Sequence, residues 1–295
     1  MKPIFKFLLL TVSVLCLTSC EDVIQVKLDE GSKLYVIDAF VNDQRTSQTI
    51  RVINNDSYFS AREAPPVAGA LVVLKDLTAN KTYNFNYTGN GNYVFNTTDA
   101  DTMCKVGHQY ELNVTIDGMT YSSLTVQKRT AKIDSISAEV IGESGFGGGR
   151  NDSTYFCNLF ACEKVDNNTD YYLVKTFRND TLFFSASDIN VCIDGTGGAV
   201  TEAGGIDSLE FTPPATLLSF KQYKKGDVCK VEVHSISRET YYFFIQAAAQ
   251  ISNGGLFATT PENVKTNITT PVEAKTKAVG WFNVATVTSK TKVVQ

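Results

Sequence analysis

Histidine and tryptophan are scarce in this sequence. The sequence also contains no recognisable catalytic or metal-binding motif. The 295 residues include two histidines, His108 and His234, and one tryptophan, Trp281. The histidines are too far apart for a His-x-x-x-His zinc helix, and neither stands in a nucleophile motif. We therefore expect no enzyme activity, no metal site and no cofactor. A hydrolase that relies on carboxylates stays open, because such residues have no recognisable spacing.

An excess of positive charge is also missing. The chain has 27 Lys and Arg against 31 Asp and Glu, and its formal net charge is −4. Non-specific binding to nucleic acid draws most of its affinity from basic patches, so we expect no nucleic-acid partner. With 43% hydrophobic and 20% charged residues, the composition is that of an ordinary globular protein and excludes a disordered or multi-pass membrane chain.

No apolar run is long enough to cross a membrane. The run from Phe7 to Leu17 follows Lys2 and Lys6, and as a helix it would measure about 16 Å against a hydrocarbon core of about 30 Å. This arrangement predicts a secretory signal over residues 1–19. The run ends in Leu17-Thr18-Ser19-Cys20, which resembles a bacterial lipobox, where the cysteine is lipidated. A generic signal peptide followed by a chance cysteine is the alternative.

The residues after Cys20 carry a second targeting signal. Glu21 and Asp22 resemble the acidic tag that exports Bacteroidetes lipoproteins to the cell surface. On this resemblance we expect an outer-membrane lipoprotein at the cell surface, with a periplasm-facing anchor as the alternative. Several acyl chains such as palmitate on Cys20 would hold the protein stably, whereas one chain would be marginal. The polar residues 20–32 are expected to form a lipidated tether.

The rest of the sequence predicts an all-β fold. Short runs rich in Val, Ile, Tyr, Phe and Thr alternate with Asn, Gly and Asp turn signals, which is typical of such proteins. Seven runs within residues 33–130 have the spacing of an immunoglobulin-like sandwich. Residues 128–132 indicate a junction, after which residues 131–295 are expected to form a second β-rich domain.

One helix interrupts the β pattern, near residues 238–252. Ser237 is its expected N-cap. Apolar residues recur at helical spacing, so we expect this stripe to pack on a sheet: Tyr241, Phe244, Ile245, Ala248 and Ile251.

Two features are candidate binding surfaces. Tyr83, Phe85 and Tyr87 fall on one face of a predicted strand, where they either belong to the core, as we favour, or form an exposed row that stacks on sugar rings. Glycine-rich stretches at residues 142–150 and 195–205 predict loops at the ends of the sheets, where binding surfaces often form. The first stretch lacks the Gly-Lys-Ser/Thr that a phosphate-binding loop requires.

The cysteines leave the redox state open. Five remain once the signal peptide is removed and Cys20 is acylated: Cys104, Cys157, Cys162, Cys192 and Cys229. An odd number cannot pair completely within the chain. Export permits disulfides, and Cys162 with Cys192 is a conceivable pair, whereas apolar neighbours favour buried free thiols at least as strongly.

The strand that contains His234 alternates regularly. Cys229, Val231 and Val233 fall on one face, and Lys230, Glu232 and His234 on the other. The alternation predicts that His234 faces solvent, without a catalytic partner.

A series of short motifs, in a fixed order along the chain, resembles a known family. The N-terminal half contributes Pro66–Val73, Gly91–Tyr93, Gly107–Leu112 and Asp117–Tyr121. The C-terminal half contributes Tyr223–Asp227, Asn253–Ala258 and Gly280–Phe282. Together they are similar to a Bacteroidetes outer-membrane lipoprotein family, the domain of unknown function 4249.

The resemblance implies a role at the outer membrane. Proteins of this family are found beside TonB-dependent transporters, their first domain resembles the carboxypeptidase-regulatory or immunoglobulin-like sandwich, and no catalytic residues are established for them. We therefore expect an accessory or binding partner of a TonB-dependent transporter in nutrient uptake. The alternatives are a surface adhesin or glycan-binding module, which would use the aromatic row or the glycine-rich loops, and a hydrolase.

Overall fold

The computed structural model describes residues 31–57, 60, 62–97, 103–140, 154–162, 169–193, 221–253, 259 and 262–295, and only the backbone of Cys162 and Ala186. Residues 33–295 form one compact unit. The predicted signal peptide, Cys20, Glu21, Asp22 and the two glycine-rich loops lie outside the described residues. Within the described part of the chain, no helix is long and apolar enough to span a bilayer.

The described residues are mostly β-strand, which confirms the predicted all-β fold. The first group of strands is β1 (Leu34–Asn42), β2 (Ser47–Asn54), β3 (Leu71–Asp76), β4 (Lys81–Gly89), β5 (Asn92–Asn96), β6 (Gln109–Ile116) and β7 (Met119–Val126). The second group is β8 (Lys132–Val140), β9 (Tyr155–Cys162), β10 (Tyr171–Arg178), β11 (Thr181–Leu182), β12 (Asn190–Ile193), β13 (Val228–Ile236), β14 (Lys277–Ala285) and β15 (Val287–Val293). The short 3₁₀ helix η1 (Ala186–Asp188) and the helix α3 (Arg238–Ile251) complete the described elements.

The first sheet is sandwich-like and encloses its own core. Its strand order is β14-β1-β2-β5-β4-β3-β6-β7, and β7 returns toward β14, where the Tyr121 hydroxyl donates to the Thr276 carbonyl at 2.7 Å. Alternate residues of each strand point inward, so in β1 the side chains of Ile37 and Ala39 are buried and that of Asp38 is accessible. The outer face of β1 and β2 is therefore left for other contacts.

The first sheet also takes a strand from the C-terminal region. β14 lies parallel to β1 over the whole of both strands, and its Phe282 and Val284 are buried in the first core. The two strands approach closely at Gly280, which has φ +112°, and a Cβ there would clash with the Ile37 carbonyl oxygen. The expected boundary near residue 130 thus does not separate the two sheets completely, because a tertiary pairing crosses it.

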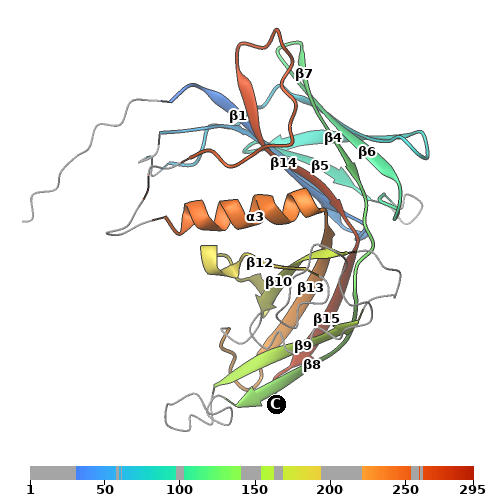
Figure 1. Cartoon of the computed structure of the whole chain (residues 1–295), viewed down its shortest axis with the longest axis vertical. Coiled ribbons are helices and arrows are strands. Elements are labelled where there is room, and N and C mark those ends of the chain that lie inside the picture. The colour runs from blue at the N-terminus through green and yellow to red at the C-terminus, as the bar shows by residue number, and fades with distance from the viewer. Residues whose placement is uncertain are drawn as a thin grey trace, which may run out of the picture. The chain divides into compact units, whose positions relative to one another are not determined.

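The second sheet and the β8–β9 ribbon enclose a second core. The sheet has the order β11-β10-β13-β15, with β12 also paired to β10. Cys157 and Leu159 of the ribbon are buried together with Val174 and Val231 of the sheet. Figure 1 shows the first sheet, including β14, and the second sheet on opposite sides of α3.

The junction between the two sheets is held by hydrogen bonds. The Lys128 carbonyl accepts from the hydroxyls of Ser235 at 2.8 Å and Thr286 at 2.7 Å. The Thr130 hydroxyl donates to the Val233 carbonyl at 3.1 Å. The predicted junction at residues 128–132 is therefore bound to the second sheet and to the turn between β14 and β15.

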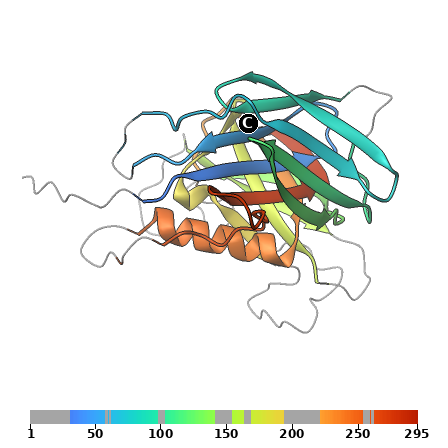
Figure 2. The same cartoon turned by 90° about the horizontal axis from the view of Figure 1, so that it is seen from above.

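Helix α3 begins as its sequence predicts, but only part of the predicted apolar stripe packs on the strands. The Ser237 hydroxyl accepts from the Thr240 amide at 3.1 Å, as an N-cap does. Phe243 stacks on Trp281 of β14 with ring centroids 4.6 Å apart, and Figure 2 shows α3 beside β1 and β14. Ile245 and Ile251 of the predicted stripe are 45% and 64% exposed, so that part of the prediction is wrong. The reason is that aromatic contacts with β1 and β14 fix how the helix is rotated.

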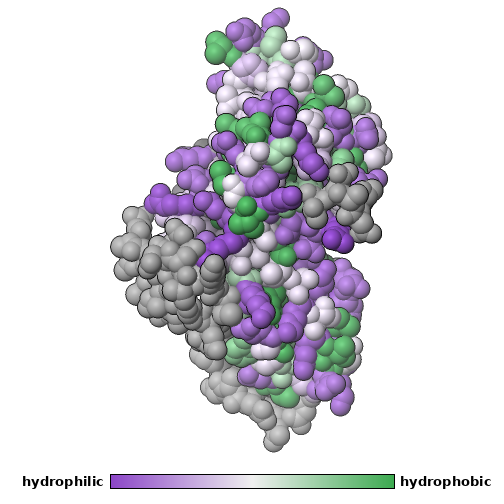
Figure 3. Space-filling model, turned by 90° about the vertical axis from the view of Figure 1, so that its right-hand side faces the viewer, coloured by the Kyte–Doolittle hydropathy of each residue, from purple (hydrophilic) through white to green (hydrophobic). Residues whose placement is uncertain are grey.

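One face of the molecule offers no continuous apolar surface among the residues described there. In Figure 3 hydrophobic residues lie scattered among hydrophilic ones on that face. Scattered surface apolar residues are normal in soluble proteins. Concave surfaces inside the fold are therefore the stronger candidates for binding.

Candidate functional site: a cavity between the two sheets

A cavity of about 580 Å³ lies between the outer face of the first sheet and the second sheet. Such volumes are typical of small-molecule sites. Its lining residues come from β1, β2, β5, β10, β11, η1 and α3 and the segments beside them: Asp38, Phe40, Thr49, Arg51, Asn92, Leu173, Lys175, Leu182, Phe183, Phe184, Ser185, Asp188, Ile189, Phe244 and Ile251. The cavity is a product of the tertiary fold, because its walls come from segments far apart in the sequence.

Three charged side chains in the cavity have no close partner among the described residues. Asp38 and Arg51 stand opposite each other on β1 and β2, and Lys175 lines the cavity from β10. Among the described residues, none of these three side chains makes a hydrogen bond or a close ion pair, although they attract one another at longer range. They are therefore available to a ligand.

Burial and neighbouring charges shift the pKa values of Asp38 and Lys175. Burial raises the pKa of Asp38, while the charges of Lys175 and Arg51 oppose the rise. Burial lowers the pKa of Lys175, while Glu232 and Asp38 oppose the fall. Asp38 is nevertheless accessible to solvent, as expected of a side chain recessed in an open cavity. Charges held at such a position are poorly hydrated, so an oppositely charged ligand group would be strongly attracted.

A charged cluster lies behind Lys175, in the second sheet. Lys175 stands opposite Glu232 on β13. The Glu232 carboxylate is 3.0 Å from His234 Nε2 and 2.7 Å from Lys230 Nζ. Burial would raise the pKa of Glu232, but the hydrogen bonds from His234 and Lys230 outweigh it and hold that pKa at about 2. The cluster keeps Glu232 ionised beside the cavity.

His234 does not face solvent as predicted. It is 6% exposed, because residues of β1 and β14 cover that end of β13 and leave only a void of about 20 Å³ beside it. Burial lowers the pKa of His234. Strict alternation failed here because both faces of β13 are covered at this end.

Aromatic rings form the apolar wall of the cavity. Phe40 of β1 packs against Phe244 of α3 with ring centroids 5.3 Å apart. Phe184 is 92% exposed at the rim, and Ile251 is 64% exposed at the end of α3. The cavity therefore combines an apolar wall with a recessed group of charges, which suits a ligand that has one charged end.

The predicted aromatic row does not line the cavity, and two of its three members lie in the first core, as we favoured from the sequence. Tyr83 and Phe85 are each 4% exposed and belong to the first core, so they cannot stack on a sugar in the folded protein. Tyr87 is 40% exposed and packs against Tyr93, with ring centroids 5.3 Å apart. The row lies on the inner face of the sandwich and ends at its edge.

A second histidine pairs with a carboxylate but has no activated nucleophile beside it. His108 Nδ1 lies 2.8 Å from the Asp76 carboxylate, which also accepts from the Tyr110 hydroxyl and the Ala79 amide. Cys104 is the nearby thiol, and burial together with the charges of Asp43 and Asp76 raises its pKa. A protonated, buried thiol is inert. The arrangement therefore serves to hold the turn after β3.

The other cysteines are also unsuited to chemistry at this site. Cys157 and Cys229 are buried free thiols in the second core. The side chain of Cys162 lies outside the described residues, as does any pairing with Cys192. No group of three or more metal-binding side chains occurs in the described part of the chain.

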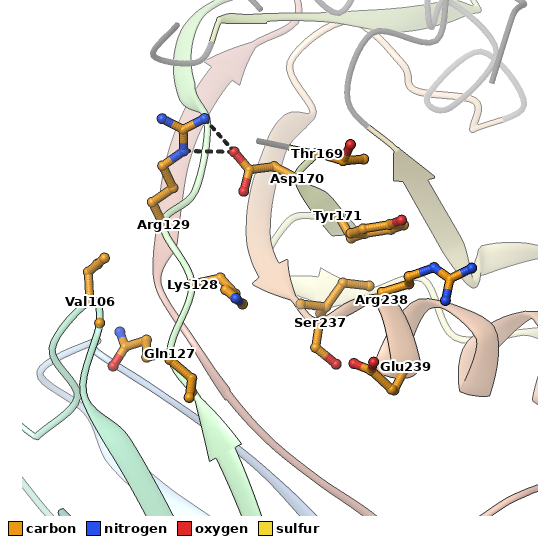
Figure 4. A pocket seen from close by; sticks show the side chains of 13 residues that line it. Val106, Gln127, Lys128, Arg129, Thr169, Asp170, Tyr171, Ser237, Arg238 and Glu239 are labelled. Carbon is orange, nitrogen blue, oxygen red and sulfur yellow. Dashed lines mark hydrogen bonds and ion pairs between the residues drawn. The ribbon is translucent and has the colours of Figure 1, made fainter. Parts of the chain in front are cut away.

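A second cavity, of about 450 Å³, lies where the junction meets the start of α3. Figure 4 shows it between residues 127–129 and residues 237–239, with Arg129 joined to Asp170. The Arg129 Nε donates to the Asp170 carboxylate at 2.7 Å. Its charges include this existing ion pair, and it lacks the aromatic wall of the first cavity. We therefore take the larger cavity as the candidate site.

Comparison with known families identifies the chain. The model of the domain of unknown function DUF4249 matches residues 21–291. The chain belongs to the DUF4249 family. This agrees with the motif order in the sequence, and the match includes every residue that lines the larger cavity.

Comparisons with solved structures and with curated proteins give no further information about this DUF4249 protein. The crystal structure of the chicken CNTN1 FN1-FN3 domains resembles it with a TM-score of 0.23 and 10% identity, over 68% of this chain and 57% of that chain. The chain thus spans little more than half the length of that structure, and a likeness this low adds nothing to what the sheets themselves show. No curated protein matches the sequence.

No motif or spacing in the sequence pointed to the charged residues of the cavity. Asp38 is the one charged residue in the apolar run Leu34–Val41, and Lys175 directly follows the apolar run Tyr171–Val174. A lone charge in such a run is a usable signal, because charged groups are seldom placed there without a partner or a function. Which charges meet could not be foreseen, since the two strands lie in different sheets.

Proposed function

We propose that this DUF4249 protein is a lipid-anchored binding protein of the outer membrane that acts as an accessory partner of a TonB-dependent transporter in nutrient uptake. The observation that carries the binding role is the cavity between the sheets, with its aromatic wall and three charged side chains that have no close partner among the described residues. The membrane role is supported by Cys20, by Glu21-Asp22 and by the similarity to Bacteroidetes lipoproteins.

The length of the expected tether is compatible with a partner role beside a membrane transporter. Residues 20–32 can reach about 40 Å when extended. Acylation of Cys20 would hold the β-sheets within that distance of the membrane, where a transporter barrel also lies. A short tether raises the effective concentration of one partner for the other, so even a weak contact would be populated.

The anchor is tested by replacing its cysteine. We predict that Cys20→Ala abolishes incorporation of radiolabelled palmitate and releases the protein from the outer-membrane fraction, because no acyl chain can then form. Cys104→Ala is the matched control and should leave labelling unchanged. Labelling of Cys20→Ala at the wild-type level would refute the lipid anchor.

The partner is tested in the native membrane. Extraction in mild detergent followed by affinity purification of the wild-type chain should recover a TonB-dependent barrel, and protease treatment of intact cells should degrade the protein if it faces outward. Recovery of the protein without any barrel would contradict the accessory role. Protection from protease would place the anchor on the periplasmic side.

A glycan-binding adhesin has weaker support. Tyr87, at 40% exposure, is the one accessible member of the aromatic row, and a single ring is a small platform. Retention of the protein on an immobilised glycan, lost in Tyr87→Ala with intact folding, would favour this second role.

A further inference from the structure

We infer that the cavity between the two sheets binds a monocarboxylate with an apolar body, such as a medium-chain fatty acid. The carboxylate would lie between Arg51 and Lys175, and the apolar body along the aromatic wall. This inference deepens the proposed function, because it rests on the cavity being the ligand site of a binding protein.

The charge balance of the cavity favours an anion. Arg51 and Lys175 supply two positive charges, and Asp38 supplies one negative charge. Asp188, the other acid of the lining, already has a partner in Lys221. Glu232, opposite Lys175, is balanced by its ion pair with Lys230. One positive charge is therefore left without compensation, and a single negative ligand group would neutralise it.

The same charges favour a carboxylate over a dianion. Arg51 can offer two parallel N–H donors to a carboxylate, and Lys175 can add a third contact. Asp38 stands directly opposite Arg51, so a second negative charge on the ligand would be repelled at close range. The position of Asp38 thus limits the ligand to one negative charge.

The apolar wall accounts for the rest of the ligand. Phe40 and Phe244 form the inner part of the wall. At the rim, Phe184 is 92% exposed and Ile251 is 64% exposed, and a bound alkyl chain would cover part of both side chains. Burial of that apolar surface would supply affinity that the charged end alone could not.

The test compares three probes of equal chain length on the full ectodomain. These are decanoate, decanol and decyltrimethylammonium, each used below its critical micelle concentration and followed by titration calorimetry. Fluorescence of Trp281, the one tryptophan of the chain, gives a second signal, since it stacks on Phe243 beside the cavity. We expect decanoate to bind at least tenfold more tightly than either of the others.

Variants test where the carboxylate lies. Lys175→Met and Arg51→Gln should each weaken decanoate binding at least tenfold, and Asp38→Asn should strengthen it severalfold by removing a like charge. Lys75→Met is the control, because Lys75 of β3 is paired with Glu111 of β6 and does not line the cavity. Thermal unfolding of each variant checks that it is folded, and Arg51→Gln decides the question if Lys175→Met does not fold.

Three results would overturn the inference. They are equal binding of decanol and decanoate, preferential binding of decyltrimethylammonium that is lost in Asp38→Asn, and no binding of any probe. If a barrel still co-purifies in these cases, the proposed function stands and only the ligand class is wrong. Tight decanoate binding without any barrel would instead refute the accessory role and leave the ligand class standing.

Discussion

Two charged residues, Asp38 and Lys175, matter most for the proposed ligand site. Asp38 and Lys175 meet in a cavity, and Glu232 lies behind Lys175 in an ion-paired cluster with His234 and Lys230. Burial raises the pKa of Asp38 and lowers that of Lys175. These shifts oppose ionisation at both residues, so keeping both charges in the cavity costs stability.

The cluster around Glu232 predicts a stability that depends on pH. The pKa of Glu232 is about 2 in the folded protein against 4.5 ordinarily, so its stabilising contribution is present above pH 4.5 and is lost as the pH falls toward 2. Burial lowers the pKa of His234, so protonating it below pH 6.5 also disfavours the fold. Both groups therefore make the protein less stable on acidification.

We predict that Glu232→Gln lowers the free energy of unfolding by about 3 kcal/mol at pH 7. The loss should shrink as the pH approaches 2, because the wild-type carboxylate is then protonated as well. Urea unfolding at several pH values measures this, with Glu111→Gln, at the surface pair with Lys75, as the control. A loss that is the same at pH 7 and pH 3 would contradict the assignment.

At the scale of elements, the contact between β1 and β14 joins the two ends of the chain. The parallel pairing of these strands depends on close approach at Gly280, where φ is +112° and any Cβ would meet the backbone of Ile37. Next to it, Trp281 donates to the Thr240 hydroxyl at 2.9 Å, so the same strand also holds the start of α3. The position of α3, and with it one wall of the cavity, follows from this pairing.

We predict that Gly280→Ala destabilises the protein by about 3 kcal/mol or more, because it adds a clash to an unfavourable φ. Gly89→Ala is the matched control, since Gly89 has φ +115° but no atom within 4 Å of the position that a Cβ would take. Gly89→Ala should lower the free energy of unfolding by about 1 kcal/mol. Chemical denaturation measures both, and equal losses would show that the approach of β14 to Ile37 is not tight.

At the scale of the whole molecule, two cores share one chain that crosses between them more than once. β14 belongs to the first sheet and β15 to the second, with only Thr286 between them. The segment after β7 crosses in the same direction and is hydrogen-bonded to β13 at Thr130. The cavity lies between the two sheets, so its shape depends on these crossings.

This arrangement predicts that residues 33–130 do not fold alone. The fragment would lack β14, leave the edge of β1 unpaired and lose Ala278, Phe282 and Val284 from the first core. We expect it to show no cooperative unfolding by circular dichroism, whereas residues 33–295 should unfold cooperatively. A cooperative transition in the short fragment would mean that the N-terminal sandwich is an independent domain after all.

The sequence by itself determined the all-β class, most of the strands, the start of α3 and the family, because these depend on local alternation, turn residues and capping. The burial of Tyr83 and Phe85 was also within reach, since residues two apart share a face of a strand. Only the tertiary structure decided that β14 joins β1, that His234 is buried and that Asp38 faces Lys175. Each of these rests on contacts between strands that are distant in the sequence, which no local pattern encodes.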